Sequence, residues 1–361
     1  MPGEPVREPS ISDGIALCAA LFDPLLPAIG KRKRLLLAPD GDLTRLPFEV
    51  LPIDDGRCLI DDYRISYLST GRDVLRFGAA SIGQPTESLV AADPDFDLSG
   101  GQAQAQLASE TVATASRGRV SRDLDRSHLH FDRLPGTGIE GERIAEMLNV
   151  QPRLSDQALE ACLKTCRSPH ILHLATHGFF LADQQRDPNK ELRDLGALGW
   201  QAEGGWGRMS GPGMENPLLR SGLALAGANT FLEHGTLPAE AEDGILTAED
   251  VSGIDLLATE LVVLSACETG LGEVRTGEGV FGLRRAFVLA GAKTLVMSLW
   301  KVPDEQTQEL MEDFYRRILA REPRAEALRE AQLAMKKKYP EPYYWGAFIC
   351  QGDPGPLPAQ V

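Results

Sequence analysis

The chain has 361 residues, of which 37 are Lys or Arg and 52 are Asp or Glu, so its net charge is −15. Its length and its 43% hydrophobic content are enough for one large domain or two moderate ones with a sizeable core. An acidic chain offers no general electrostatic attraction to phosphate, which argues against direct nucleic-acid binding. A basic or neutral polypeptide partner is easier to accommodate.

The sequence also indicates the cellular compartment of the protein. No uninterrupted apolar run reaches the roughly 18 residues of a membrane helix, and the first residues, 1–9, are polar and Pro-rich rather than signal-like. The cysteines have no disulfide-framework spacing; they are Cys18, Cys58, Cys162, Cys166, Cys267 and Cys350. This pattern fits a reducing compartment. We therefore expect a soluble cytoplasmic protein without membrane association and with a usable thiol.

The amino-terminal third predicts short elements. Residues 11–29 have helical spacing, but Pro24 and Pro27 divide the run into a helix and a poorly helical tail. Strands are expected at 33–39, as two short pieces within 58–70, and at 88–92, with a turn or brief helix at 46–49. Residues 97–128 lack aromatic residues altogether, which predicts a long flexible loop or a disordered insertion.

Strand and helix alternate in the rest of the chain. Helices are predicted at 140–148, 155–165 with Ser155 as N-cap, a short one capped by Thr247 and Asp250, 277–290, 304–320 and 324–338. Strands are predicted before His177, at 221–227, before Cys267, at 294–300 and at 344–350, and a long surface loop at 181–215. This alternation is typical of an α/β fold whose sheet has mostly parallel strands flanked by helices.

Two of these strands end in reactive side chains. Residues 260–267 read ELVVLSAC, an apolar strand followed by a small-residue turn with Cys267, and residues 170–178 read HILHLATHG, ending in His177 and Gly178. Open α/β sheets place their chemistry at the carboxyl ends of strands. If the two strands are neighbours, His177 and Cys267 face each other.

A thiol and an imidazole together form the minimal machinery for acyl transfer. Only about a few per cent of an unperturbed thiol is ionised at neutral pH, so Cys267 needs a base, and His177 can supply it and later protonate the leaving amine. The amide N–H groups of Gly178 and Cys267 are the candidate oxyanion hole. Taken singly, each residue is more simply a buried core residue, because free cysteines are usually buried. The pairing favours the catalytic interpretation.

Four motifs resemble those of CHAT-domain cysteine peptidases, the bacterial branch related to caspases and separases. They are LLLAPDGDLTRLPFEVLP (35–52), HLATHGFF (173–180), LVVLSACETGLGEVRTGEGVFGLRRAFVLAGAKTLVMSLWKVPDEQT (261–307) and YYWGAFICQGD (343–353). The resemblance implies a caspase-like fold with His177 as base and Cys267 as nucleophile. It also implies an inert amino-terminal half packed against an active carboxyl-terminal half.

The resemblance divides the chain into four parts. These are a helical extension (1–32), an inert half that includes the flexible segment (33–133), an active caspase-like half (134–352) and a tail (353–361). It further implies that the 181–215 loop is a candidate for self-processing. Asp304, in the loop and helix start after Trp300, is implied as a substrate-binding acid for a basic side chain, with Lys301 beside it to offset its charge. The simpler alternative is that Asp304 caps the helix that begins there.

Two other kinds of site are weighed and set aside. Cys162, Cys166, His170 and His173 fall on a helix and a strand without a zinc-knuckle spacing, so we expect no metal, and we interpret His173 as a supporting or core residue. The glycines after Cys267 do not form G-x-G-x-x-G, so a nucleotide site is not expected. No cofactor is required.

We therefore predict a cysteine endopeptidase that hydrolyses peptide bonds of a protein partner through a Cys–His dyad and an acyl-enzyme. One candidate substrate is a protein encoded by a neighbouring gene. A regulatory protein is a further candidate partner. A catalytically silent scaffold of the same fold, acting as an interaction module in a signalling or defence complex, is the alternative. A small-molecule hydrolase would need an enclosed pocket, whereas the long loops favour an open cleft.

Overall fold

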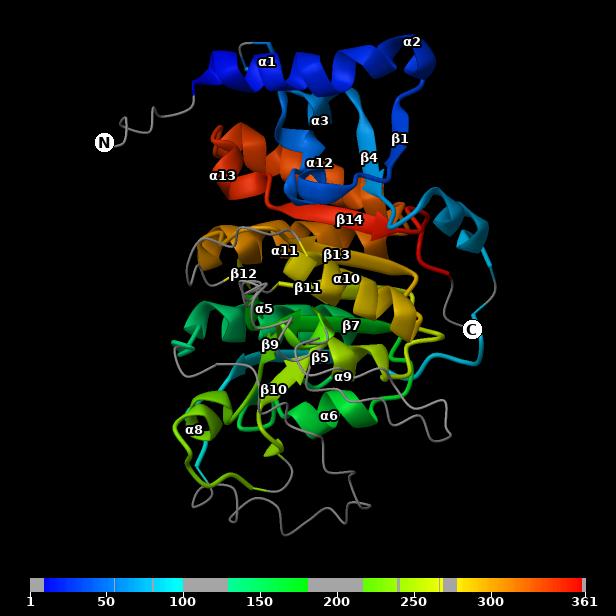
Figure 1. Ribbon diagram of the computed structural model, residues 1–361. Coiled ribbons are helices and arrows are strands. Elements are labelled where there is room, and N and C mark those ends of the chain that lie inside the picture. Colours follow the sequence, from blue (N-terminus) through cyan, green and yellow to red (C-terminus); the bar gives the residue numbers. More distant parts are fainter. Residues whose placement is uncertain are drawn as a thin grey trace, which may run out of the picture.

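The computed structural model describes residues 10–54, 56–79, 81–99, 129–180, 217–238, 241–265, 267–268 and 278–358 (Figure 1). Strands and helices alternate along most of this chain, as predicted. The fold is a mixed α/β structure built on one large, mostly parallel sheet with helices on its faces. The segments predicted as flexible, 97–128 and 181–215, lie almost entirely outside the described residues.

The large sheet has eight strands. In spatial order they are β1 (Arg34–Leu37), β4 (Arg64–Tyr67), β14 (Phe348–Gly352), β13 (Thr294–Ser298), β11 (Leu261–Leu264), β7 (Ile171–Ala175), β5 (Leu89–Pro94) and β6 (Arg153–Ser155). All neighbours are parallel except β13 and β14. Every residue of β7, β11 and β13 is buried, as expected for parallel strands covered on both faces.

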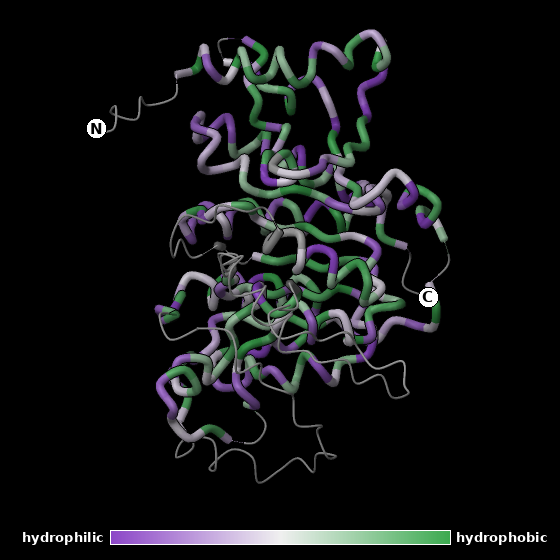
Figure 2. Tube along the Cα trace, in the orientation of Figure 1, coloured by the Kyte–Doolittle hydropathy of each residue, from purple (hydrophilic) through white to green (hydrophobic). Residues whose placement is uncertain are grey.

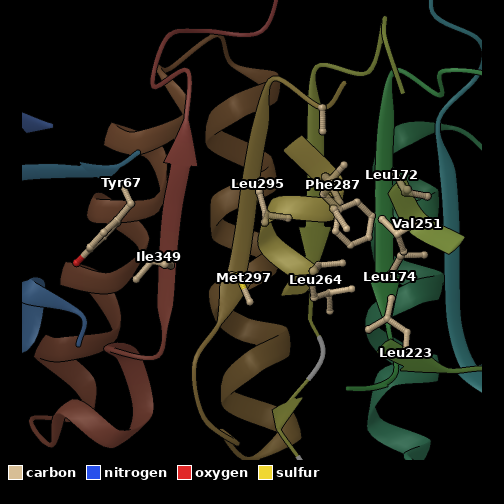
Figure 3. Close-up of a cluster of buried hydrophobic side chains, with 14 of the residues drawn as sticks. Tyr67, Leu172, Leu174, Leu223, Val251, Leu264, Phe287, Leu295, Met297 and Ile349 are labelled. Atoms are coloured by element: carbon tan, nitrogen blue, oxygen red, sulfur yellow. The ribbon is translucent and has the colours of Figure 1, made fainter. Parts of the chain in front are cut away.

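Helices cover the two faces of this sheet. On one face α10 (Glu278–Ala290) inserts Phe287 between side chains of β7, β11 and β13, and α9 (Ala248–Ser252) contributes Val251 (Figure 3). On the other face α5 (Pro135–Leu148), α11 (Asp304–Leu319) and α12 (Arg324–Lys338) form a second apolar cluster. Figure 2 shows hydrophobic residues along the sheet and hydrophilic ones along the outer turns. This packing holds helices from distant parts of the sequence against the central strands β7, β11 and β13.

The amino-terminal elements extend the same sheet. The helical stretch comprises α1 (Ile11–Phe22), the 3₁₀ turn η1 (Asp23–Leu25) and α2 (Leu26–Ile29), so the break predicted at the prolines is present. Further short elements are η2 (Gly41–Arg45), η3 (Phe48–Val50), β2 (Pro52–Asp54), β3 (Arg57–Cys58), α3 (Leu59–Asp62) and η4 (Gly71–Arg76). Within 58–70 the prediction of two strands was wrong in part. Asp61 accepts a hydrogen bond from the Cys58 amide and begins a helical turn instead of a strand.

The stretch Ile11–Ile29 differs from the rest of the described chain in one respect. It has the length and mean hydropathy (1.4) of a membrane-crossing helix, and only 11% of it is buried. Surface helices, core helices and amino-terminal leader segments meet the same length and composition criterion, so this observation alone does not assign it to a membrane.

A second, four-stranded sheet lies at the carboxyl ends of β7 and β11. Its order is β10 (Ile245–Thr247), β9 (Ser221–Ala224), β8 (His177–Phe180) and β12 (Cys267–Glu268). The adjoining short helices are η6 (Pro217–Leu219) and α8 (Ala228–Leu232). The predicted cap of α9 is confirmed, because Thr247 and Asp250 form a capping box.

Several boundary predictions were wrong; α5, for example, begins at Pro135 and not at residue 140. Ser155 is the last residue of β6 with φ near +52°, and α6 (Glu160–Thr165) begins five residues later. The last strand begins at Phe348 and not at Tyr344, because Pro342 starts the helical turn α13 (Pro342–Trp345). At Ser155 and at Tyr344 a second short element adjoins the predicted one, and the hydrophobic pattern did not separate the two.

Candidate active site

His177 and Cys267 lie on adjacent strands. Each residue begins a short strand of the second sheet, β8 after β7 and β12 after β11, and β7 pairs with β11 in parallel. The Ser265 amide donates to the Leu174 carbonyl across the break between the sheets. In the register of β8 and β12, Cys267 is the direct partner of His177, and neighbouring strands lie about 4.8 Å apart. The predicted juxtaposition of these two strand ends is therefore present.

The His177 imidazole is held in one orientation. Its side chain is buried against the rings of Phe96 and Phe131, whose centroids lie 5.4 Å and 5.8 Å away. Its Nε2 atom lies 2.7 Å from the carbonyl oxygen of Asp132. A carbonyl can only accept, so Nε2 carries the proton and Nδ1 is the unprotonated nitrogen of the neutral ring. Nδ1 is buried and has no hydrogen-bond partner in the described part of the chain.

Burial also sets the protonation state of this ring. Burial lowers the pKa of His177 below 6.5, partly opposed by the hydrogen bond to Asp132. The Lys301 ammonium lowers that pKa further, whereas the Asp132 and Asp304 carboxylates raise it. The imidazole is therefore mostly neutral at pH 7, the form that can accept a proton.

A buried asparagine fixes the backbone beside His177. The amide of Phe131 donates to Asn229 Oδ1 and the Phe131 carbonyl accepts from Asn229 Nδ2, both at 2.9 Å. The Asn229 amide donates to the Phe96 carbonyl, also at 2.9 Å. Asn229 is the second residue of α8, whose N-cap is Gly227 in left-handed conformation. It thereby ties together the two segments whose phenyl rings pack against the imidazole.

An ion pair anchors the same segment on its other side. Arg133 donates from Nε and Nη2 to the two carboxylate oxygens of Asp93, at 3.1 Å and 3.0 Å. Asp93 is in the last part of β5, and its own amide donates to Thr137 Oγ1. Asp132 thus lies between two anchored residues, Phe131 and Arg133. The proposed division after residue 133 stays a prediction, but residues on both sides of it surround His177.

His173 is a core residue, as interpreted from the sequence. Its Nδ1 lies 3.0 Å from the Tyr315 hydroxyl and its Nε2 lies 3.3 Å from Glu140 Oε1. Glu140 Oε2 accepts a hydrogen bond from Ser265, two residues before Cys267. All four side chains are buried. This polar cluster lies beneath the site and links α5 and α11 to the strand that carries Cys267.

The structure brings Asp304 into the neighbourhood of His177. Asp304 is the first residue of α11 and is half-buried, and no side-chain hydrogen bond caps this helix. Its side chain packs against Gly136 of α5, where an added Cβ would lie 2.3 Å from the Asp304 Cβ. The capping alternative is therefore not observed. Its role toward a substrate stays a prediction.

The remaining predicted site residue is Gly178. It is paired with Glu268 on β12 and with Leu223 on β9, so it lies between the two strands beside the site. Its oxyanion role stays a prediction. In the described ranges, no group of three or more His, Cys, Asp or Glu side chains is arranged to hold a metal ion.

Several residues around His177 were not found from the sequence. Phe96, the adjacent pair Phe131 and Asp132, and Asn229 belong to three separate segments, and the Asp132 contact uses a backbone atom that carries no residue-type signal. The one available hint was the return of an aromatic residue, Phe131, directly after a long stretch without any.

A model of the CHAT domain family matches residues 13–353 of the chain. Tetratricopeptide repeat protein 28 of Homo sapiens is 22% identical over 341 residues, which cover 90% of this chain and 12% of that protein. Its Mus musculus counterpart is 27% identical over 225 residues, covering 61% of this chain and 9% of the other. The chain thus spans about a tenth of the length of these relatives.

Among solved structures, the Saccharomyces cerevisiae separase–securin complex aligns with 86% of this chain and 15% of that chain, at 12% identity and a TM-score of 0.40. The Arg-specific cysteine proteinase gingipain R aligns with 98% of this chain and 69% of that chain, at 10% identity and a TM-score of 0.48.

Proposed function

The chain belongs to the CHAT domain family, and from this membership and the geometry at His177 we propose that it is a cysteine endopeptidase acting on a protein substrate. The observation that carries the proposal is the direct register of Cys267 with His177, whose Nε2 is bound to the Asp132 carbonyl. That arrangement reserves Nδ1 as the proton acceptor. It supplies the base that a neutral thiol lacks.

In the proposed reaction, His177 Nδ1 takes the proton of the Cys267 thiol, and the thiolate attacks the scissile carbonyl carbon. The tetrahedral intermediate is stabilised by the amides of Gly178 and Cys267. Its collapse breaks the C–N bond, and the imidazolium gives its proton to the leaving amine. Water, deprotonated by His177, then hydrolyses the thioester and restores the thiol. The dyad residues supply every proton transfer in this scheme.

The alternative is a catalytically silent module of the same fold. The two proposals differ in the reactivity of Cys267, because only an enzyme needs an activated thiol. They can therefore be separated before any natural substrate is known.

The test measures the rate at which each cysteine is alkylated by iodoacetamide at pH 7, followed by peptide mass spectrometry. We expect Cys267 to react faster than the other five cysteines and His177→Ala to slow it. The matched controls are His234→Ala, at an exposed histidine, and Cys162→Ser, at a thiol whose pKa burial raises. In parallel, Cys267→Ala and His177→Ala should each lower cleavage of labelled casein by at least about 10³-fold while leaving the fold intact. A Cys267 that reacts no faster than Cys162, with or without His177, would favour the silent module.

A further inference from the structure

A buried arginine outside the active site lacks the partners that a buried charge requires. Arg284, on α10, is 4% exposed. Its Nε donates to the sulfur of Met297, a weak acceptor, and its Nη2 has no hydrogen-bond partner. Burial lowers the pKa of Arg284 to about 10, and the one side chain in the described contacts that counters this effect is Tyr67, which is not a carboxylate. An isolated buried cation is among the costliest features a fold can contain.

A second buried arginine, Arg324, has the partners that Arg284 lacks within the described ranges. Arg324 is 2% exposed and donates to the carbonyl oxygens of Gly355 and Glu260. The carboxylates of Glu260 and Asp353 each lie 3.6 Å from its guanidinium. One buried arginine is thus compensated by two acids and two carbonyls. Arg284 has no comparable set among the described residues.

The Arg284 side chain lines a small cavity of about 10 Å³, which has room for one small particle. Its walls come from the amino-terminal part of the chain and from α10 and β14; they are Pro39, Thr44, Tyr67, Leu68, Ser69, Arg284, Arg285 and Gln351. These eight residues include two guanidinium groups, three hydroxyls and one amide, and no carboxylate. In a chain of net charge −15 such a wall is unusual, and its chemistry is that of an anion site.

The hydroxyl and amide groups leave donors available in this wall. Gln351 Nε2 donates one hydrogen to Ser69 Oγ, so Ser69 uses that oxygen as an acceptor and keeps its own hydrogen. Tyr67 and Thr44 commit their hydrogens elsewhere, to Glu49 and to the Gly41 carbonyl. An anion beside Arg284 Nη2 would meet a cation and at least one neutral donor.

Glu49 is the nearest alternative counter-charge, acting through Tyr67. Its Oε2 accepts from the Tyr67 hydroxyl at 2.5 Å, so the phenol stands between this carboxyl group and Arg284. Burial raises the pKa of Glu49 to about 7, so the group carries only part of a negative charge at neutral pH. Glu49 therefore does not replace a direct partner for Arg284.

We propose that this cavity binds a monatomic anion of the size of chloride, held by Arg284 between the amino-terminal part of the chain and α10. The cavity is too small for phosphate, sulfate or a carboxylate compound. An anion bound here stabilises the folded state, because the unfolded chain has no such site. The proposal is independent of the peptidase function.

The test compares the thermal unfolding of the whole chain in sodium chloride, sodium bromide and sodium gluconate at equal ionic strength. We expect chloride and bromide to raise Tm by about 1–3 °C over gluconate, with saturation, and Arg284→Met to lose this difference. Arg324→Met is the matched control: it should lower Tm in all three salts, because it removes the guanidinium that contacts the Glu260 and Asp353 carboxylates and two carbonyl oxygens, and it should keep the halide effect.

A crystallographic measurement does not depend on any variant folding. Crystals soaked in sodium bromide should give an anomalous peak within hydrogen-bond distance of Arg284 Nη2. A wild-type Tm that is the same in chloride and gluconate, a halide effect that persists in Arg284→Met, or a water molecule in place of bromide would each overturn the proposal.

Discussion

His177 Nε2 lies 2.7 Å from the carbonyl oxygen of Asp132, a backbone atom of a residue 45 positions earlier in the chain. The contact decides which ring nitrogen keeps its proton, and so which nitrogen can act as a base. A carboxylate partner would raise the pKa of the imidazole strongly. A carbonyl partner orients the ring in the same way but raises its pKa less, because it carries no net charge. The protonation state of His177 is thus set mainly by burial.

We predict that Asn229→Ala lowers catalytic efficiency without touching either dyad residue. The substitution removes both hydrogen bonds to the Phe131 backbone, so the Asp132 carbonyl is anchored on one side only, by the Arg133–Asp93 ion pair. A loss of about tenfold or more in kcat/KM is expected, with a loss of about 1–3 kcal/mol in the free energy of unfolding.

The control for Asn229 is Asp97→Ala. Asp97 accepts from Asn229 Nδ2 at 2.9 Å but has no hydrogen bond to Phe131, so this change should leave kcat/KM nearly unchanged. The pH dependence of the rate of Cys267 alkylation is the second measurement. It should change if Asn229 positions His177, and it should not change if Asn229 only stabilises the fold. If Asn229→Ala lost stability but kept the wild-type pH profile, Asn229 would only hold α8 in place.

The pH dependence of Cys267 alkylation should report His177. The base must be unprotonated, so the rate falls as pH falls through the pKa of His177, which burial places below 6.5. Lys301→Met removes a charge that lowers this pKa, so the acid limb should move to higher pH, and the shift should shrink in high salt because Lys301 is exposed. Lys337→Met, at an exposed lysine on α12, is the control. An acid limb that does not move in Lys301→Met at low salt would contradict this assignment.

The sequence predicted the parts of the site that follow a local pattern. An apolar run that ends in a reactive side chain is visible in one segment, so both strand ends and their pairing could be predicted. The surroundings of His177 depend on contacts between distant segments: Phe96, Asn229 and Asp132 come from three separate parts of the chain. No periodicity within any one segment encodes such a contact.

The same reason explains the errors in the elements. The 58–70 stretch has strand-forming residues, but the Asp61 side chain bonds the Cys58 amide and turns the chain into α3. Polar side-chain contacts of this kind compete with the strand pattern over a few residues. They were invisible to an argument from hydrophobic spacing alone.

We predict that Glu49 makes the protein less stable as pH rises. Burial raises its pKa from 4.5 to about 7, so between these values the folded state binds a proton that the unfolded state has lost. Stability from this group is present below pH 4.5 and is lost as pH rises to about 7, by an amount on the order of 3 kcal/mol.

Glu49→Gln should remove that dependence. Urea unfolding at pH 5 and pH 8 should show a smaller loss of stability for the variant than for the wild type, whereas Glu142→Gln, at an exposed position of α5, should behave as the wild type does. Equal slopes of stability against pH for wild type and Glu49→Gln would show that Glu49 is already ionised in the folded state at pH 5.

The last prediction concerns the residue that the proposed peptidase prefers before the cut. Asp304 is half-buried beside Gly136, and its carboxylate and the Lys301 ammonium both act on His177 with opposite sign. A substrate side chain that reaches this region therefore meets an acid and a base together. If Asp304 binds a basic side chain, Asp304→Asn should lose cleavage after Arg or Lys in a peptide library. Lys301→Met should strengthen it, because the offsetting charge is gone.

A purely structural role for Asp304 gives a different pattern. An acid in the first turn of α11 interacts favourably with the helix dipole, by about 0.3–1 kcal/mol, even without a capping hydrogen bond. In that case Asp304→Asn would lower Tm slightly and leave the cleavage profile unchanged, as Glu305→Gln, at the exposed acid next to it, should do. A changed profile in Asp304→Asn and not in Glu305→Gln separates substrate recognition from helix stabilisation, because both substitutions remove one charge from the same helix end.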